Sequence, residues 1–172
     1  METWDAIRAR RNVRSYTSQP IDQADLDRIL EAGRRAPSAR NWQPWDFVVV
    51  TGQAELTELA RVSPSAGHVA RSAATIALVA PRLDDERRRE GLLRYDLGQA
   101  TMSMLIEAAD LGIGSGHAGV ADQDLARRLL GFPDDRFLAY LIALGYPADR
   151  PLAPLARPDR RPFQDVVHFG RW

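Results

Sequence analysis

The sequence predicts an α+β or α/β sandwich in which helices flank a small central sheet. Segments with apolar residues every three or four positions alternate along the chain with short apolar runs of strand length. Runs such as Phe47–Val50 and Ile76–Ala80 suit buried strands and are too short to span a bilayer. Neither a repeat nor a linker divides the 172 residues, so we expect one domain over 1–172, with an arm from about 148 to 172.

The first half of the chain carries two expected helices and two expected strands. A short amphipathic helix with Trp4, Ile7 and Ala6 runs into a basic segment, 8–11. Asp22 is the expected cap of a second helix, whose apolar residues recur at helical spacing until Pro37 ends the run. Further elements are expected at 46–50 (buried strand), about 53–61 (helix) and 73–80 (buried strand).

The second half is dominated by the longest expected helix, which begins among residues 84–86 and ends at Gly112. Several of its residues are small, which would let another helix approach closely: Gly98, Ala100, Ser103, Ala108 and Ala109. A strand at 113–115, a helix at 122–130 and a strand at 137–144 are expected to follow. The proline-rich tail beyond Gly145 is expected to be an extended arm, because proline supports neither helix nor sheet interior.

Composition excludes several classes of function. Basic and acidic residues both number 23, and this balance disfavours broad nucleic-acid binding. Every basic residue other than histidine is arginine, so an anion site must use guanidinium groups, and no lysine is available as a base. Without cysteine there is neither a disulfide framework nor a thiolate nucleophile. The N-terminus lacks a signal-peptide pattern, and we therefore expect a cytoplasmic protein without a membrane segment.

Three segments are candidates for chemistry, and the first is Arg10–Arg14. Its three guanidinium groups and one amide could grip a phosphate through paired hydrogen bonds. The alternative is a solvated basic surface at a helix C-terminus, where cations suit the helix dipole.

The second candidate is the loop 36–45, and the third is the glycine-rich run 112–119. The loop combines two tryptophans, two prolines and two amides just before a strand, so it could bind a planar ligand or simply be anchored by tryptophan packing. The run 112–119 follows an expected helix, whereas a dinucleotide-binding glycine motif must follow a strand, so we reject that reading. Its His117 is a weak signal alone, and His68 and His168 are too far apart in sequence to indicate a metal site.

Taken together and in this order, the motifs resemble the FMN-dependent nitroreductase family over nearly the whole chain. They are Ala6-Ile7 with Arg10–Tyr16, Ala36-Pro37-Ser38 with Asn41 and Gln43-Pro44-Trp45, Phe47–Val50, Asp96–Ala100, Leu111–Ser115, Leu144–Pro147, and Arg160–Phe163 with Val166–His168 and Arg171-Trp172. The resemblance implies an α+β fold with a central mixed sheet flanked by helices. It also implies an interlocked homodimer with an extended C-terminal arm and two FMN sites at the subunit interface.

The resemblance also implies roles for particular residues. Those for the FMN phosphate and ribityl chain are Arg10, Arg11, Asn12 and Arg14, with Arg160 and Arg161 of the arm completing the clamp. The residues that would line the cofactor, from the partner subunit, are Pro37, Ser38 and Ala39, with Asn41 and Gln43 fixing their loop. His117, Ala118 and Gly119 would lie along the flavin, with a backbone N–H near Gly119 facing N5. The small-residue helix from Asp96 to Ala109 would be dimer interface.

The activity implied is that of an oxidoreductase. NADH or NADPH would pass a hydride to flavin N5, and a nitroaromatic, quinone or similar acceptor would then enter the same place, giving ping-pong kinetics. No catalytic side chain and no metal are required. The alternatives are a protein that stores or senses FMN, and a family variant that oxidises a biosynthetic intermediate.

Three features depart from the family pattern. Asn12 stands where serine is more usual, although an amide can still donate and accept hydrogen bonds. A basic or amide residue expected before the second strand is either His68 or Arg71. The chain is also too short for the inserted helices that often cover the substrate, which predicts an open active site.

Overall fold

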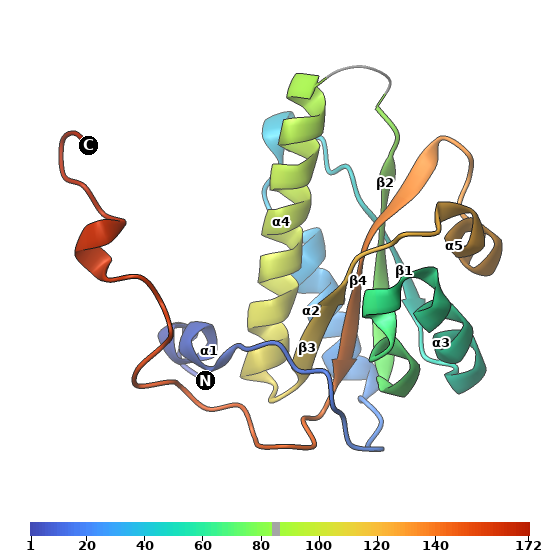
Figure 1. Ribbon diagram of the computed structural model, residues 1–172, viewed down its shortest axis with the longest axis horizontal. Coiled ribbons are helices and arrows are strands. Elements are labelled where there is room, and N and C mark those ends of the chain that lie inside the picture. The colour runs from blue at the N-terminus through green and yellow to red at the C-terminus, as the bar shows by residue number, and fades with distance from the viewer. Residues whose placement is uncertain (84–86) are drawn as a thin grey trace.

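A four-stranded sheet in the order β1-β2-β4-β3 organises the molecule, and every pair of neighbouring strands is antiparallel. The computed structural model describes residues 1–83 and 87–172. The strands are β1 (Asp46–Val50), β2 (Ala74–Pro81), β3 (Gly114–Ala118) and β4 (Arg136–Gly145) (Figure 1). β2 and β4 form the centre of the sheet, and both are largely buried.

Helices cover both faces of the sheet. They are α1 (Thr3–Ala9), α2 (Gln23–Arg34), α3 (Gln53–Leu59), α4 (Arg87–Asp110) and α5 (Gln123–Leu130). α2 and α4 pack on one face around Ile76, Leu78 and Ile142. α3 and α5 pack on the other face around Val79 and Leu141 (Figure 1). The alternation of side chains along β2 and β4 therefore builds two cores from one sheet.

Close packing of α2 on α4 depends on Gly33. A Cβ added there would lie 2.7 Å from the Cγ of Met104, which is itself fully buried. The contact explains why the helical spacing of α2 includes a glycine.

The predicted α+β class is confirmed, and most elements lie close to their expected positions. The sheet was expected to be mixed, but its strand pairs are antiparallel throughout the described residues, and the parallel pairing of Asn12 with Ser115 is an isolated bridge outside the strands. The strand 46–50 has the expected bounds but lies at an edge of the sheet and is half-buried, not buried. The expected start of the longest helix at 84–86 lies outside the described residues.

Two further expectations need correction. Trp4 is 66% exposed and Ile7 is also exposed, because α1 buries its alanines, Ala6 and Ala9. In α4, Ala100, Ala108 and Ala109 are almost completely buried in the chain's own core, so they give no evidence of a dimer interface.

The C-terminal arm leaves the body of the molecule, as expected. After β4 the chain passes beneath α1 and extends away from the sheet, with only the short 3₁₀ turn Phe163–Asp165 in its last part (Figure 1). Its apolar side chains stand in solvent: Phe169 is 87% and Trp172 is 98% exposed. Over the described part of the chain, we find no helix with the length and hydropathy needed to cross a membrane.

Candidate functional site

Glycines on β3 allow an extended segment, residues 12–16, to lie directly against the edge of the sheet. The Val13 N–H donates to Ser115 O at 2.8 Å. A Cβ added at Gly116 would lie 2.4 Å from Val13 O, and one added at Gly114 would lie 2.7 Å from the Val13 side chain. Only glycine leaves room for this contact. The glycine-rich run is thus a strand whose small residues bring the segment with Arg14 against its edge.

Four cationic or titratable side chains gather at this edge: Arg10, Arg14, His68 and His117, here called the cation cluster. Burial lowers the pKa of His117, and the nearby charges of Arg10, Arg14 and His68 lower it further. Burial also lowers the pKa of His68, and the nearby charge of Arg14 acts in the same direction. Arg10 and Arg14 are both positively charged and lie together with two imidazoles that can donate hydrogen bonds, so the cluster favours a bound anion.

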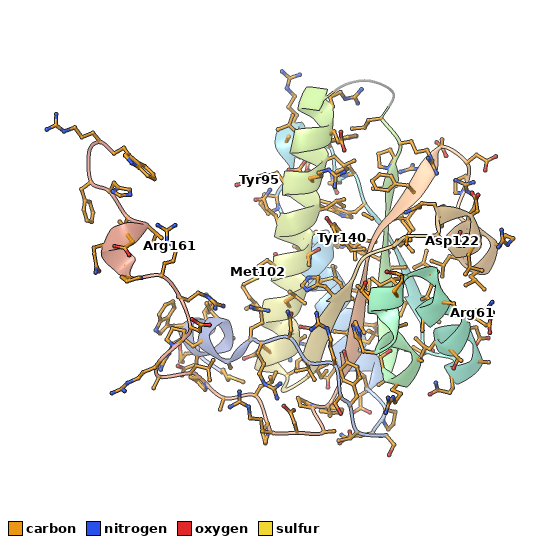
Figure 2. The ribbon with its side chains drawn as sticks, viewed as in Figure 1. Arg61, Tyr95, Met102, Asp122, Tyr140 and Arg161 are labelled. Carbon is orange, nitrogen blue, oxygen red and sulfur yellow. The ribbon has the colours of Figure 1, made fainter. Side chains whose placement is uncertain are left out.

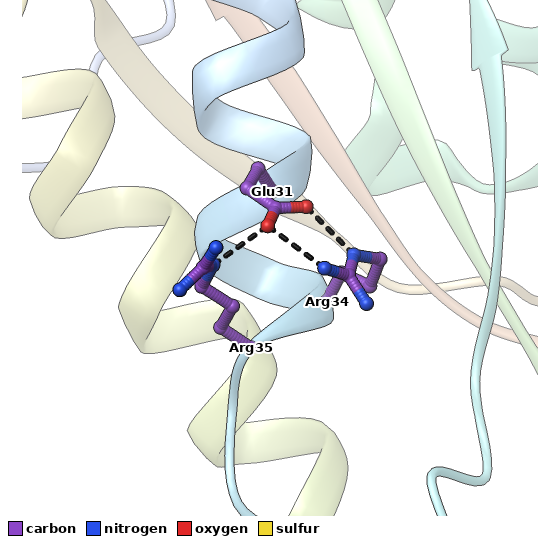
Figure 3. A network of polar contacts seen from close by, with 3 residues as sticks. All are labelled: Glu31, Arg34 and Arg35. Atoms are coloured by element: carbon purple, nitrogen blue, oxygen red, sulfur yellow. Dashed lines mark hydrogen bonds and ion pairs between the residues drawn. The ribbon is translucent and has the colours of Figure 1, made fainter.

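Several other arginines already have carboxylate partners. At the end of α2, Glu31 accepts hydrogen bonds from Arg34 and Arg35, each with Nε at 2.6 Å (Figure 3). These hydrogen bonds lower the pKa of Glu31 to about 2. Within residues 1–83 and 87–172, Arg10 and Arg14 have no such ion pair. Arg10 and Arg14 are therefore placed to bind a ligand, whereas these other arginines bind the protein itself.

Arg11 contacts the arm and not the cation cluster. Its Nη2 donates to Asp149 Oδ1 at 2.7 Å and to Arg150 O at 2.8 Å. This ion pair lowers the pKa of Asp149. The contact fastens the start of the arm to the segment that follows α1.

The loop 36–43 is held by α4. Buried Asp96 accepts a hydrogen bond from Ala39 N at 3.1 Å, and Gln99 Nε2 donates to Pro37 O at 3.3 Å. Within the loop, Gln43 N donates to Ser38 Oγ at 2.9 Å and Gln43 Nε2 donates to Asn41 O at 3.2 Å.

Three non-glycine residues of this loop have positive φ: Arg40 at 54°, Asn41 at 58° and Gln43 at 51°. Such conformations cost of the order of 1–3 kcal/mol each and are concentrated at functional sites, where the surrounding structure holds them. Here the hydrogen bonds from α4 supply that support. The strain therefore marks this loop as a candidate site, independently of its residue types.

The structure does not bring all the sequence-predicted residues together in one chain. Loop 36–43 contacts α4 at Asp96, whereas the N-terminal amine pairs with Asp110, about 20 Å further along the helix. Arg160 and Arg161 donate to backbone oxygens of the arm itself, and Figure 2 shows Arg161 well away from the sheet. Ala118 is buried at the end of β3, and the exposed Gly119 follows it.

His68 is the member of the cation cluster that sequence reasoning could not assign. Its Nε2 is buried and has no hydrogen-bond partner among the described residues. A Cβ added at Gly116 would lie 3.1 Å from His68 Cδ2, so this glycine also makes room for the imidazole. The sequence signal was weak because the position of an isolated histidine before a strand does not indicate that a distant glycine, Gly116, will pack against it.

Chemically, this edge is suited to an anion. The described residues contain no group of three or more histidine, aspartate or glutamate side chains placed to hold a metal. Guanidinium groups bind phosphate through several parallel hydrogen bonds, and lowered histidine pKa values keep the imidazoles able to accept or donate. The site fits a ligand with a phosphate group.

The comparisons with known proteins agree with this chemistry. The model of the family described as "Nitroreductase family" matches residues 7–146. The chain is 32% identical over 171 residues to an Archaeoglobus fulgidus protein with the provisional name NADH dehydrogenase/NAD(P)H nitroreductase, covering 96% of each.

Two solved structures show the same fold. One is an FMN-dependent nitroreductase from Clostridium difficile, with a TM-score of 0.83 and 21% identity over 97% of this chain and 98% of that chain. The other is the NADPH:FMN oxidoreductase of Vibrio harveyi complexed with NAD+, with a TM-score of 0.83 and 24% identity over 97% of this chain and 76% of that chain.

Proposed function

The chain belongs to the nitroreductase family and is an oxidoreductase, and we propose that it works with FMN and with NADH or NADPH as reductant. When bound, FMN supplies the two-electron chemistry that links hydride donation by the nicotinamide to reduction of a nitroaromatic, quinone or similar acceptor. The two substrates use the same place in turn, which gives ping-pong kinetics.

The cation cluster is the observation that carries this proposal. The phosphate of FMN bears close to two negative charges at neutral pH, and the cluster offers two guanidinium groups without carboxylate partners in the described structure. The unpartnered, buried His68 Nε2 is a polar atom that a ligand would satisfy. The donor set at this edge therefore fits FMN.

Within one chain, Arg10, Asn12 and Arg14 would bind the phosphate and ribityl chain. Arg11 would act indirectly, because it holds the arm through Asp149. His117, Ala118 and Gly119 would lie along the ring system, where the exposed Gly119 leaves its backbone N–H open to a ligand. The positive charge of Arg10 and Arg14 would favour additional negative charge on the cofactor.

The other half of the site would come from a second copy of the chain in a homodimer. Pro37, Ser38 and Ala39 would line the cofactor bound by the partner, because in their own chain they lie towards the opposite end of α4 from the segment after α1 (Figure 1). Arg160 and Arg161 would reach the phosphate bound by the partner, because in their own chain they lie on the arm, which extends away from the sheet (Figure 2).

Exposed apolar side chains support such a dimer. Tyr95 is 68% exposed and Met102 is 38% exposed, both on α4 (Figure 2), and Gly98 between them has no atom within 4 Å of an added Cβ. Trp4 on α1 and Phe169 and Trp172 on the arm are also exposed. Large apolar side chains exposed in this number are typical of a surface that another chain covers.

The test is the visible spectrum of the purified protein, followed by identification of the pigment that heating releases. We expect one FMN per chain and acceptor-dependent oxidation of NADH or NADPH. A protein that binds FMN stoichiometrically but turns over slowly with both nicotinamides would support FMN storage instead. A colourless protein that does not take up added FMN would contradict the proposal.

A further inference from the structure

We propose that a cleft between loop 36–43 and the first turns of α4 binds an aromatic ring that carries a negatively charged group. Its walls are Ala39, Arg40, Trp42, Arg89 and Leu92, and its volume is about 600 Å³. The inference rests on the proposed function, since the loop that forms the cleft is the one proposed to line FMN.

A flat aromatic wall is the first requirement for a planar ligand, and Trp42 supplies it. The guanidinium carbon of Arg89 lies 5.2 Å from the centre of the Trp42 ring. This stacking holds the long arginine side chain along the indole and orients the ring. Leu92 adds an apolar surface beside them, so the cleft suits an aromatic ring and not a small polar solute.

Positive charge at the mouth of the cleft comes from Arg40. Its side chain is exposed, and among residues 1–83 and 87–172 it has no ion pair. Its backbone has φ 54° and ψ 27°, a conformation that glycine or asparagine would adopt at lower cost. An arginine at such a position is explained if its side chain has a functional role there. The role that best suits a guanidinium group is binding an anion.

Two kinds of molecule have this chemistry. One is an acceptor with a carboxylate or similar group on its aromatic ring, and the other is the reduced nicotinamide dinucleotide, whose pyrophosphate is close to its ring. Both would place a ring against Trp42 and an anion against Arg40. The experiment distinguishes them by measuring the two halves of the reaction separately.

The test uses the FMN-loaded protein and two acceptors of the same shape, 4-nitrobenzoate and 4-nitrobenzyl alcohol. The measured quantity is the ratio of kcat/KM for the charged acceptor to that for the neutral one. We expect Arg40→Gln to lower this ratio about fivefold to thirtyfold, and Trp42→Leu to weaken both acceptors. Arg128→Gln, an exposed arginine on α5, is the matched control and should leave the ratio unchanged.

Two further measurements complete the test. Calorimetric titration with 4-nitrobenzoate in the absence of reductant should show weaker binding to Arg40→Gln than to wild type, by a similar factor. If Arg40→Gln instead raises only the NADH concentration that gives half-maximal flavin reduction, the anion that Arg40 binds is the pyrophosphate of the dinucleotide. Unchanged acceptor ratio, titration and NADH dependence in Arg40→Gln would overturn the proposal. Absence of bound FMN in the wild type would instead contradict the proposed function, and the titration would still test the cleft.

Discussion

The two halves of the proposed site are held in place by different means. The segment 12–16 lies against β3 because Gly114 and Gly116 have no side chain, so steric fit and a backbone hydrogen bond position Arg14. Loop 36–43 has a strained backbone and is positioned by two hydrogen bonds with α4: Asp96 accepts one from Ala39 N, and Gln99 donates one to Pro37 O. The position of segment 12–16 thus depends on two glycines that lack a side chain, whereas the position of loop 36–43 depends on the side chains of Asp96 and Gln99. They should respond differently to substitution.

The largest effect is expected where steric fit alone acts, at Gly116→Ala. The added Cβ would lie 2.4 Å from Val13 O, so the segment must move away from β3. Unfolding free energy should fall by about 1–3 kcal/mol, and FMN affinity should fall by about a hundredfold or more, as measured by thermal denaturation and fluorescence titration. Gly67→Ala, where nothing lies within 4 Å of an added Cβ, should change neither.

A smaller effect is expected when one cation is removed and the backbone stays in place. Arg14→Ala should weaken FMN binding about tenfold to a hundredfold, since a charged hydrogen-bonding contact contributes roughly 1.5–3 kcal/mol. Arg8→Ala is the control, because Arg8 lies on α1 beside Asp5 and outside the cation cluster. Equal FMN affinities in the two variants would refute the assignment of Arg14.

The loop offers a substitution that can be rescued. Asp96→Ala removes the acceptor for Ala39 N, which should lower stability by about 1–3 kcal/mol and FMN affinity about threefold to tenfold. Asp96→Asn keeps an oxygen at the same place and should recover most of both losses. If Asp96→Asn behaves like Asp96→Ala, the charge and not the hydrogen bond positions the loop.

The smallest effect is a pH dependence confined to the cation cluster. The pKa values of His68 and His117 are lowered in the folded protein. Below about pH 6.5 the unfolded chain therefore takes up protons that the folded chain does not, and stability falls as pH falls. Between pH 7.5 and 5.5, Tm of the FMN-free protein should drop by about 1–3 °C more in wild type than in His68→Gln/His117→Gln. Parallel Tm curves for the two proteins would show that the histidines are not shifted.

The difference between the two halves also explains what could be predicted from the sequence. Apolar runs defined β1, β2 and β4 because burial depends on side-chain type. Most of β3 was not predicted, because a strand made of glycine and other small residues has no apolar pattern. Burial of Ala100 and Ala108 in the chain's own core was equally invisible, because small residues suit a core as well as an interface.

The site residues divide in the same way. Arg10 and Arg14 were proposed as ligand-binding residues from residue type and spacing, but the hydrogen bond of Arg11 to Asp149 depends on where the arm runs. His68 enters the cation cluster through its contact with Gly116, a relation between residues far apart in sequence. The positive φ of Arg40 could not be predicted because arginine gives no local signal for a left-handed backbone.

Whether two chains share each FMN site is tested most directly with a heterodimer of two differently tagged variants. One chain carries Arg14→Ala, and the other carries Ala39→Glu, which places bulk and negative charge where the loop is proposed to line the cofactor. Each homodimer should bind little FMN, whereas the heterodimer has one site in which both halves are wild type. We predict about one tightly bound FMN per heterodimer. A folded heterodimer that binds no more FMN than either homodimer would contradict a site shared between subunits.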